Sequence, residues 1–168
     1  MQGKLRVERG DTARDLTVSG TNSRFAEVRS LDLAMGGFLT DADLDDQARV
    51  VVLGWGAYTD LYDEGEYPIA QTIDVDGVRM EVVGVIEEQG GIGLEDYNLF
   101  VPLTTAQARF FPQRTLSGER PLATVYASVV DETQIDAAVD QITEVLRDRH
   151  NLAPVSYTHL TLPTKRIV

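Results

Sequence analysis

Short strands are predicted in the first quarter of the chain, where apolar residues alternate with polar ones. The alternation runs through Leu5 and Val7, and again through Leu16 and Val18. A period of two residues is typical of a strand with one buried face. The other elements predicted here are a turn at residues 19–22, a helical turn at residues 25–28, a strand at residues 31–35, and a break at Gly36 and Gly37.

A continuous apolar run at residues 50–53 is the best candidate for a central strand. It reads Val-Val-Val-Leu, the pattern of a strand covered on both faces. Apolar residues then recur at helical spacing through residues 55–62, which predicts a helix packed back on that strand. A β-hairpin follows, with strands at residues 72–75 and 78–86 around an Asp-Gly turn.

The second half of the chain combines a loop, further strands and a long helix. Residues 87–97 hold three glycines and four acids, which predicts a mobile loop or a hairpin tip. The clearest amphipathic helix spans residues 132–150, and its apolar face is expected to pack on the strand before it. The remaining predicted elements are a strand at residues 99–101, a helix capped by Thr104 and Thr105 that runs to about residue 111, turns at residues 112–120, and a strand at residues 124–130. The pattern as a whole predicts an α+β fold.

Composition limits the classes of protein to which the chain can belong. Its 168 residues are 43% hydrophobic, enough for one domain or two small subdomains that share a core. The 27 acidic and 15 basic side chains give a net charge of -12. Such a field repels phosphate backbones and anionic lipid headgroups, so we expect a binder neither of nucleic acid nor of a membrane surface. The chain contains no cysteine. It also has no signal-peptide pattern and no apolar run long enough to cross a membrane, so it is expected to be soluble.

Two motifs suggest ligand chemistry and are better explained structurally. The segment Gly54-Trp55-Gly56 follows a strand, as in a dinucleotide site, but Thr59 replaces the third glycine of that fingerprint. We interpret it as a tight turn into a packed helix. The spacing of Asp41, Asp43 and Asp45 matches the start of a calcium loop, but the glycine and the closing glutamate of that loop are absent. We interpret these acids as a solvated helix start, and we predict that Thr40 caps this helical turn.

No constellation for catalysis is found, so we predict no catalytic residue, no metal ligand and no cofactor site. His150 is the sole histidine outside the final segment, and it is placed at a helix end. The acids of the predicted loop, Glu87, Glu88, Glu95 and Asp96, are instead candidates for contact with a basic partner protein. The alternative for this loop is a solvated tip with no partner.

Several blocks of the chain resemble the extracytoplasmic core domain of MacB-like ABC-transporter permeases, in the wider FtsX-like permease family. These blocks are VSGTNSRFAEV at residues 18–28, GFLTDAD at 37–43, VVVLG at 50–54, PIAQTI at 68–73, VVGV at 82–85, FVPLTTA at 100–106 and LRDRH at 146–150. Their order and spacing carry the resemblance. Two positions depart from the family pattern: Phe38 stands where an arginine is usual, and Ala70 where a glycine is usual.

The resemblance implies a domain organisation. Residues 1–154 would be part of the core domain, with a β-rich inserted subdomain at about 18–103. The strand and long amphipathic helix at about 121–150 would return to a mixed, membrane-proximal subdomain, whose first strand and helix are expected to be missing from this chain. Residues 155–168 break the pattern and resemble translated adapter sequence, so we interpret them as a non-native tail.

The resemblance also implies a non-enzymatic function at the extracytoplasmic face of the cell membrane. In this family the domain lies between two membrane helices of a permease, which joins it to an ABC ATPase subunit or domain. The expected role is to transmit ATP-driven motion to a substrate or to an adaptor protein outside the membrane, within a dimeric transporter. The alternatives are a small-molecule or peptide binding domain, with a cleft near Gly54 and the Gly90-Gly91 loop, and, more remotely, a carboxylate hydrolase.

Overall fold

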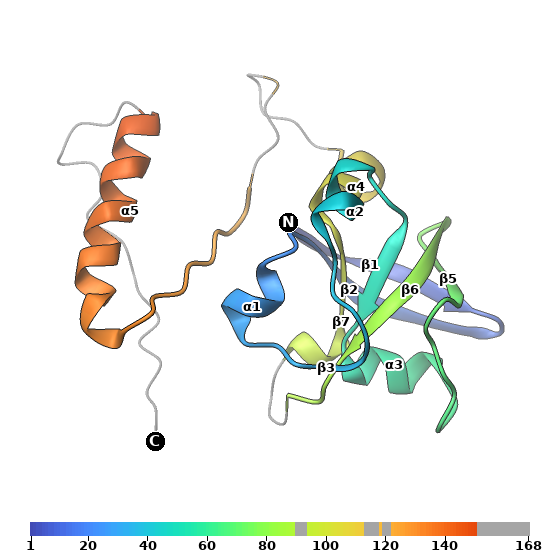
Figure 1. Cartoon of the computed structure of the whole chain (residues 1–168). Coiled ribbons are helices and arrows are strands. Elements are labelled where there is room, and N and C mark those ends of the chain that lie inside the picture. The colour runs from blue at the N-terminus through green and yellow to red at the C-terminus, as the bar shows by residue number, and fades with distance from the viewer. Residues whose placement is uncertain (90–93, 113–117, 119–121, 151–168) are drawn as a thin grey trace. The chain divides into compact units, whose positions relative to one another are not determined.

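The computed structural model describes residues 1–89, 94–112, 118 and 122–150. It divides into two units, Met1–Ala127 and Ser128–Val168, and each is described by itself. The described residues of the first unit form seven strands. They are labelled in Figure 1: β1 (Gln2–Arg9), β2 (Thr12–Thr21), β3 (Leu33–Gly36), β4 (Val50–Leu53), β5 (Thr72–Val75), β6 (Val78–Ile86) and β7 (Asn98–Pro102). Its helices are α1 (Phe25–Arg29), α2 (Asp41–Asp45), α3 (Trp55–Leu61), η1 (Leu94–Tyr97), α4 (Leu103–Thr105) and η2 (Ala106–Phe110).

The strands form one mixed sheet that closes on itself. Its order is β3-β6-β4-β7-β2-β1-β5, and β5 also pairs with β6. Six strands therefore make a closed ring, while β3 pairs with β6 alone. The long β6 makes this possible, because its first half pairs with β5 and its second half with β3 along the same edge.

Two hydrophobic clusters lie on the two faces of this sheet. Each strand of the ring contributes buried side chains to the larger cluster, which α3 also joins through Ala57, Tyr58 and Leu61. The smaller cluster gathers Phe100 and Val52 from the sheet with apolar residues from the segments around α1 and α2. Val52 stands between Val51 and Leu53 in β4, and all three are fully buried, so the predicted central strand is confirmed as an interior strand.

The predicted hairpin is confirmed at its predicted bounds, because its turn is determined locally. Asp76 and Gly77 both have positive φ, and the Asp74 carboxylate accepts a 2.6 Å hydrogen bond from the Gly77 N–H. The turn predicted at residues 19–22 is wrong, because β2 continues to Thr21. Residues 17–21 pair in parallel with β7, a long-range partner that local sequence does not reveal.

Helix caps are predicted correctly at one position and wrongly at another. Thr40 and Asp43 form a capping box at the start of α2, as expected for a threonine that caps this turn. Thr104 and Thr105 are not caps: they lie inside the α4 and η2 segment, and their hydroxyl groups donate to the carbonyl oxygens of Leu44 and Ala48. They hold this helix against the segment that precedes β4.

The interpretation of residues 87–97 as a hairpin tip is wrong. A hairpin needs paired flanking strands, but β4 lies between β6 and β7 in the sheet. The segment is instead a connection that crosses β4 at one end of the sheet, and its last residues form the 3-10 helix η1. Residues 90–93, which include Gly90 and Gly91, lie outside the described residues.

The strand predicted at residues 124–130 is wrong, because none of these residues is in a strand. The alternation is present, but a strand also needs a neighbour to which its backbone can hydrogen bond. The described part of the second unit contains η3 (Glu132–Gln134) and α5 (Ile135–His150), which confirms the predicted amphipathic helix. The packing of its apolar face on the residues before it crosses the boundary between the two units and stays a prediction. The tail at residues 155–168 lies outside the described residues.

Ala70 gives a first testable prediction, because its backbone has the left-handed φ of +64°. A Cβ atom is disfavoured there by about 1–2 kcal/mol, while the greater freedom of glycine in the unfolded chain offsets part of this cost. We therefore expect Ala70→Gly to raise the free energy of unfolding by about 0.5–1 kcal/mol. Urea denaturation measures this change. Ala13→Gly, in the extended strand β2, is the control and should lower the free energy of unfolding. Equal effects of the two changes would contradict the prediction.

Candidate functional site

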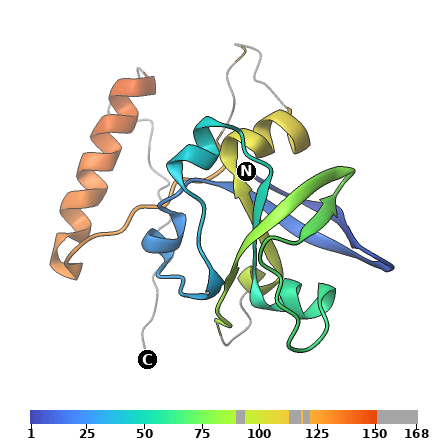
Figure 2. The same cartoon turned by 45° about the vertical axis from the view of Figure 1, so that its right-hand side comes forward.

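Two acidic segments meet at one end of the sheet. Strands β4 and β6 are parallel and β7 is antiparallel to β4, so the connections after β4 and after β6 lie at the same end. We call the described residues of these two connections, 54–71, 86–89 and 94–97, the acidic end. It occupies the lower part of both views, around α3 (Figure 1, Figure 2). The sequence places no lysine or arginine in these segments, and their acids are Asp60, Asp63, Glu64, Glu66, Glu87, Glu88, Glu95 and Asp96.

The structure brings the two flanks of the 87–97 connection together. Gln89 donates from its backbone N–H to Asp96 at 3.2 Å and from its side chain to the Glu87 carbonyl oxygen at 3.0 Å. The Glu87 N–H in turn donates to the Asp32 carbonyl oxygen at 2.9 Å. The side chains of Glu87 and Glu88 are exposed, and Asp96 is half-buried. The side chain of Glu95 lies outside the described residues.

Gly56 has a structural role in the Gly54-Trp55-Gly56 motif. A Cβ atom on Gly56 would lie 2.9 Å from the ring of Tyr97 and 3.1 Å from the Asp96 carbonyl oxygen. The glycine therefore allows α3 and η1 to approach closely, in agreement with the interpretation of this motif as a tight turn into a packed helix. Tyr97 is 55% exposed and follows directly after Asp96 in the connection.

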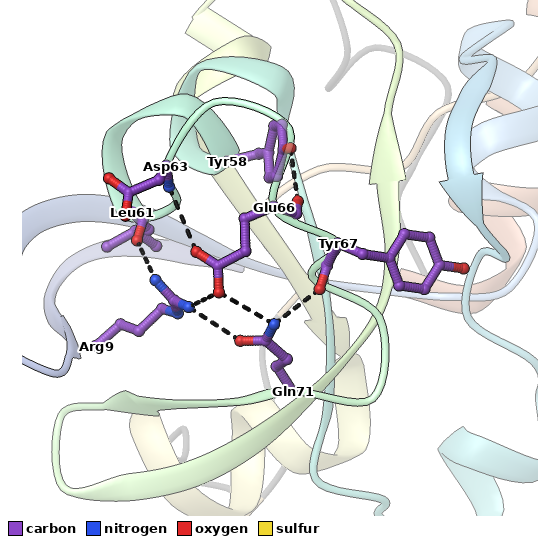
Figure 3. Close-up of polar contacts among 7 residues, drawn as sticks. All are labelled: Arg9, Tyr58, Leu61, Asp63, Glu66, Tyr67 and Gln71. Carbon is purple, nitrogen blue, oxygen red and sulfur yellow. Dashed lines mark hydrogen bonds and ion pairs between the residues drawn. The ribbon is translucent and has the colours of Figure 1, made fainter.

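A polar network that the sequence analysis missed holds the other segment of the acidic end (Figure 3). Arg9, at the end of β1, forms an ion pair with Glu66. It also donates 3.0 Å hydrogen bonds to the Leu61 carbonyl oxygen and to the side chain of Gln71. The guanidinium group lies over the ring of Tyr62, 3.9 Å from its centroid, in a cation–π contact.

Glu66 and Gln71 fix the course of the connection between α3 and β5. The Glu66 carbonyl oxygen accepts a 2.8 Å hydrogen bond from the Tyr58 hydroxyl, and its carboxylate accepts bonds from the Gln71 side chain and the Asp63 N–H. Gln71 also donates to the Tyr67 carbonyl oxygen at 2.7 Å. The ring of Tyr67 points away from the network and is 62% exposed (Figure 3). The connection thus presents an aromatic side chain on a fixed backbone.

The network changes the acidity of two of its members. The hydrogen bond from Gln71, together with the positive charge of Arg9, lowers the pKa of Glu66 below its ordinary value. Burial raises the pKa of Tyr62. The Tyr62 hydroxyl is buried and has no hydrogen-bond partner among the residues that the structure describes. Its ring, packed under Arg9, contributes contact area.

The lowered pKa of Glu66 predicts a pH dependence of stability. Because the folded-state pKa is lower than the unfolded one, the carboxylate stabilises the fold at neutral pH, and this contribution is lost as the pH falls through the folded-state value. Wild type should therefore lose more stability than Glu66→Gln between about pH 7 and about pH 3. Urea midpoints measure this loss. The exposed neighbour variant Glu64→Gln should follow wild type, and parallel curves for wild type and Glu66→Gln would contradict the assignment.

Two of the three acids that suggested a calcium loop have other roles. Asp43 belongs to the capping box of α2, and Asp41 accepts a hydrogen bond from Ser23. Among the described residues, no group of three or more histidine, cysteine or acidic side chains is placed to hold a metal ion. No helix in the described ranges combines the length and the hydropathy of a membrane span.

The fold is an α+β domain on a strand-rich mixed sheet, and comparison with known proteins identifies its family. The chain belongs to the MacB-like periplasmic core domain family, whose sequence profile matches residues 2–145. A relative from Aeromonas hydrophila, "Macrolide export ATP-binding/permease protein MacB 1", is 32% identical over 86% of this chain and 22% of its own length. "Pyoverdine export ATP-binding/permease protein PvdT" of Pseudomonas entomophila is 26% identical over 88% of this chain and 22% of its own length. The chain thus spans about a fifth of these relatives.

Solved structures share the fold. The periplasmic region of MacB from Actinobacillus actinomycetemcomitans superposes with a TM-score of 0.73 and 22% identity, over 89% of this chain and 64% of that one. The extracellular domain of the transporter YknZ from Gram-positive bacteria gives a TM-score of 0.72 and 20% identity, over 90% of this chain and 74% of that one. These likenesses bear on the fold alone.

Proposed function

We propose that the chain is the extracytoplasmic domain of an ABC-transporter permease and that it performs no chemistry of its own. The observation that carries this proposal is the match of the MacB-like periplasmic core domain over residues 2–145. In the full transporter the domain is joined through membrane helices to an ATPase subunit or domain, and it transmits ATP-driven motion to a substrate or adaptor protein. The transporter is a dimer. Residues 18–103 form the inserted β-rich subdomain, and residues 121–150 return to the membrane-proximal part.

The absence of cysteine makes the proposed location directly testable. A single cysteine placed at the exposed position Asp45, in the full-length transporter with other cysteines removed, should react with a membrane-impermeant maleimide in intact cells or spheroplasts. A cysteine in the ATPase part is the control and should react after lysis. Labelling of both positions only after lysis would place the domain in the cytoplasm and overturn the proposal.

We further propose that the acidic end contacts the partner protein. The exposed acids Glu87 and Glu88 lie at the same end of the sheet as Tyr67 and Tyr97, two exposed aromatic side chains. Tyrosines held on an ordered backbone are frequent anchors in protein interfaces, and surrounding carboxylates speed association with a basic surface. The partner is therefore expected to present basic side chains around an apolar patch.

Neutralising the four predicted contact residues tests this surface. The combined variant Glu87→Gln, Glu88→Gln, Glu95→Gln and Asp96→Asn should slow partner association in low salt and reduce transport, because the electrostatic attraction is lost. Basal ATP hydrolysis and thermal stability should stay at wild-type values. The control neutralises four exposed acids elsewhere, Asp45, Asp46, Asp76 and Glu81. Equal effects of the two sets would show that net charge, and not this surface, matters.

A further inference from the structure

Three arginines that are far apart in the sequence line one pocket. Between residues 49 and 109 the basic side chains are Arg49, Arg79 and Arg109, spaced thirty residues apart. They come from three places in the fold: the position before β4, strand β6, and the η2 helix. All three line a pocket of about 380 Å³, together with Asp74, Gly77 and Val78. The fold thus gathers every positive charge of this sixty-residue stretch in one place.

The guanidinium groups are available to a ligand. None of the three forms a hydrogen bond or ion pair with the residues that the structure describes, and all three are exposed. Arg49 is held beside β6 by its backbone, since its carbonyl oxygen accepts a 2.8 Å hydrogen bond from the Glu81 N–H. Arg79 follows in the neighbouring strand, directly across from Asp74. Ordered strands therefore position two of the three side chains.

The charge of the pocket is opposite to that of the chain. Asp74 is the acidic residue among those that line the pocket, and its carboxylate is already bound to the Gly77 N–H at 2.6 Å. Three arginines and one aspartate leave a charge of about +2, within a chain of net charge -12. A phosphate monoester carries about -1.5 to -2 at neutral pH, and its oxygens match the planar fork of arginine.

We propose that Arg49, Arg79 and Arg109 form a binding site for a phosphate group. The group belongs either to a small phosphate ester or to a lipid headgroup, and the chemistry of recognition is the same for both. The pocket has room for the phosphate and leaves the substituent in solvent. The site lies at the opposite end of β4 from the acidic end, so the inference is independent of the proposed partner surface.

Inorganic phosphate titrated into the full chain tests the site. At constant ionic strength maintained with sodium chloride, the Nε–H resonances of the three arginines should shift and saturate in NMR spectra. Arg79→Gln and Arg109→Gln should each weaken binding at least tenfold. Arg109→Gln keeps the test valid if Arg79→Gln disturbs the strand pair with Asp74. Arg14→Gln, which removes an exposed arginine outside this pocket, should leave binding unchanged.

A second measurement separates the two sources of phosphate. Sedimentation with phosphatidylcholine vesicles that contain phosphatidic acid should recover the chain if the ligand is a lipid headgroup, and Arg109→Gln should abolish recovery. If the chain binds free phosphate but does not sediment with the vesicles, the ligand is a soluble phosphate ester. Shifts that chloride alone reproduces, no saturation, or an equal loss in Arg14→Gln would overturn the site.

Discussion

Replacing Phe100 with alanine should lower the free energy of unfolding by about 3–5 kcal/mol, the usual cost of removing a buried phenylalanine. Phe100 is 1% exposed and lies in β7, in the interior of the sheet. The centroid of its ring is 5.4 Å from that of Phe25, in α1, and 6.2 Å from that of Phe38, which follows β3. The ring therefore joins these two segments to the sheet. Removing the ring would therefore leave a cavity between the sheet and the two other rings of the cluster.

Urea denaturation followed by circular dichroism measures this loss, and the single tryptophan, Trp55, reports on the α3 side of the sheet. Phe38→Ala is the matched control. The Phe38 ring belongs to the same cluster but is only partly buried, so its removal should cost less than half as much. Equal losses for Phe38→Ala and Phe100→Ala would show that Phe100 is not the centre of the cluster.

Gly84→Ala should be the second of the two most damaging changes. It should lower the free energy of unfolding by about 3 kcal/mol, the upper end of the range for overpacking. Gly84 pairs with Gly36, and a Cβ atom on Gly84 would collide with the carbonyl oxygen of Gly37. Backbone cannot move aside as a flexible side chain can, so β3 would have to separate from β6. The pairing of β6 with β4 is also irregular next to Gly84 and would be strained further.

Gly37→Ala is the control for this change, because it adds the same methyl group on the opposing segment. A Cβ atom on Gly37 meets no atom within 4 Å, and its φ is not positive. The control should therefore change stability by less than about 0.5 kcal/mol. Thermal unfolding of the two variants compares them. A harmless Gly84→Ala would mean that β3 does not pack on β6 as described.

Features determined within a few residues could be predicted from the sequence. The Asp-Gly hairpin, the Thr40 cap and the amphipathic helix at residues 132–150 depend on neighbours in the chain, and all are found. Alternation at residues 124–130 predicted a strand that is not found. The pattern indicates which side chains could share a face, but a strand also needs a neighbouring strand with which to pair.

In the candidate site, too, local features could be predicted from the sequence and long-range contacts could not. Composition alone singled out residues 87–97, where glycines and acids are concentrated. The second segment of the acidic end was missed, because its order depends on Arg9, which is 57 residues from Glu66 and 62 from Gln71. The meeting of Arg49, Arg79 and Arg109 was missed for the same reason. Such contacts follow from the strand order, and a parallel pair such as β4 and β6 leaves no turn signal in the sequence.

The ring of strands is not equally strong around its circumference. β1 pairs with β2 through eight residue pairs but with β5 through two, Val7 with Val75 and Glu8 with Asp74. β4 and β7 also share two residue pairs, but the four side chains of that join are buried, whereas Glu8 and Asp74 are partly exposed. Of these two short joins, the one between β1 and β5 is therefore the weaker. Arg9 lies one residue beyond it, and its side chain binds Glu66 and Gln71. A pull on the domain would therefore open the barrel between β1 and β5 and turn it into a curved, open sheet. Backbone amides at this join should exchange their hydrogens with solvent before those shared by β1 and β2.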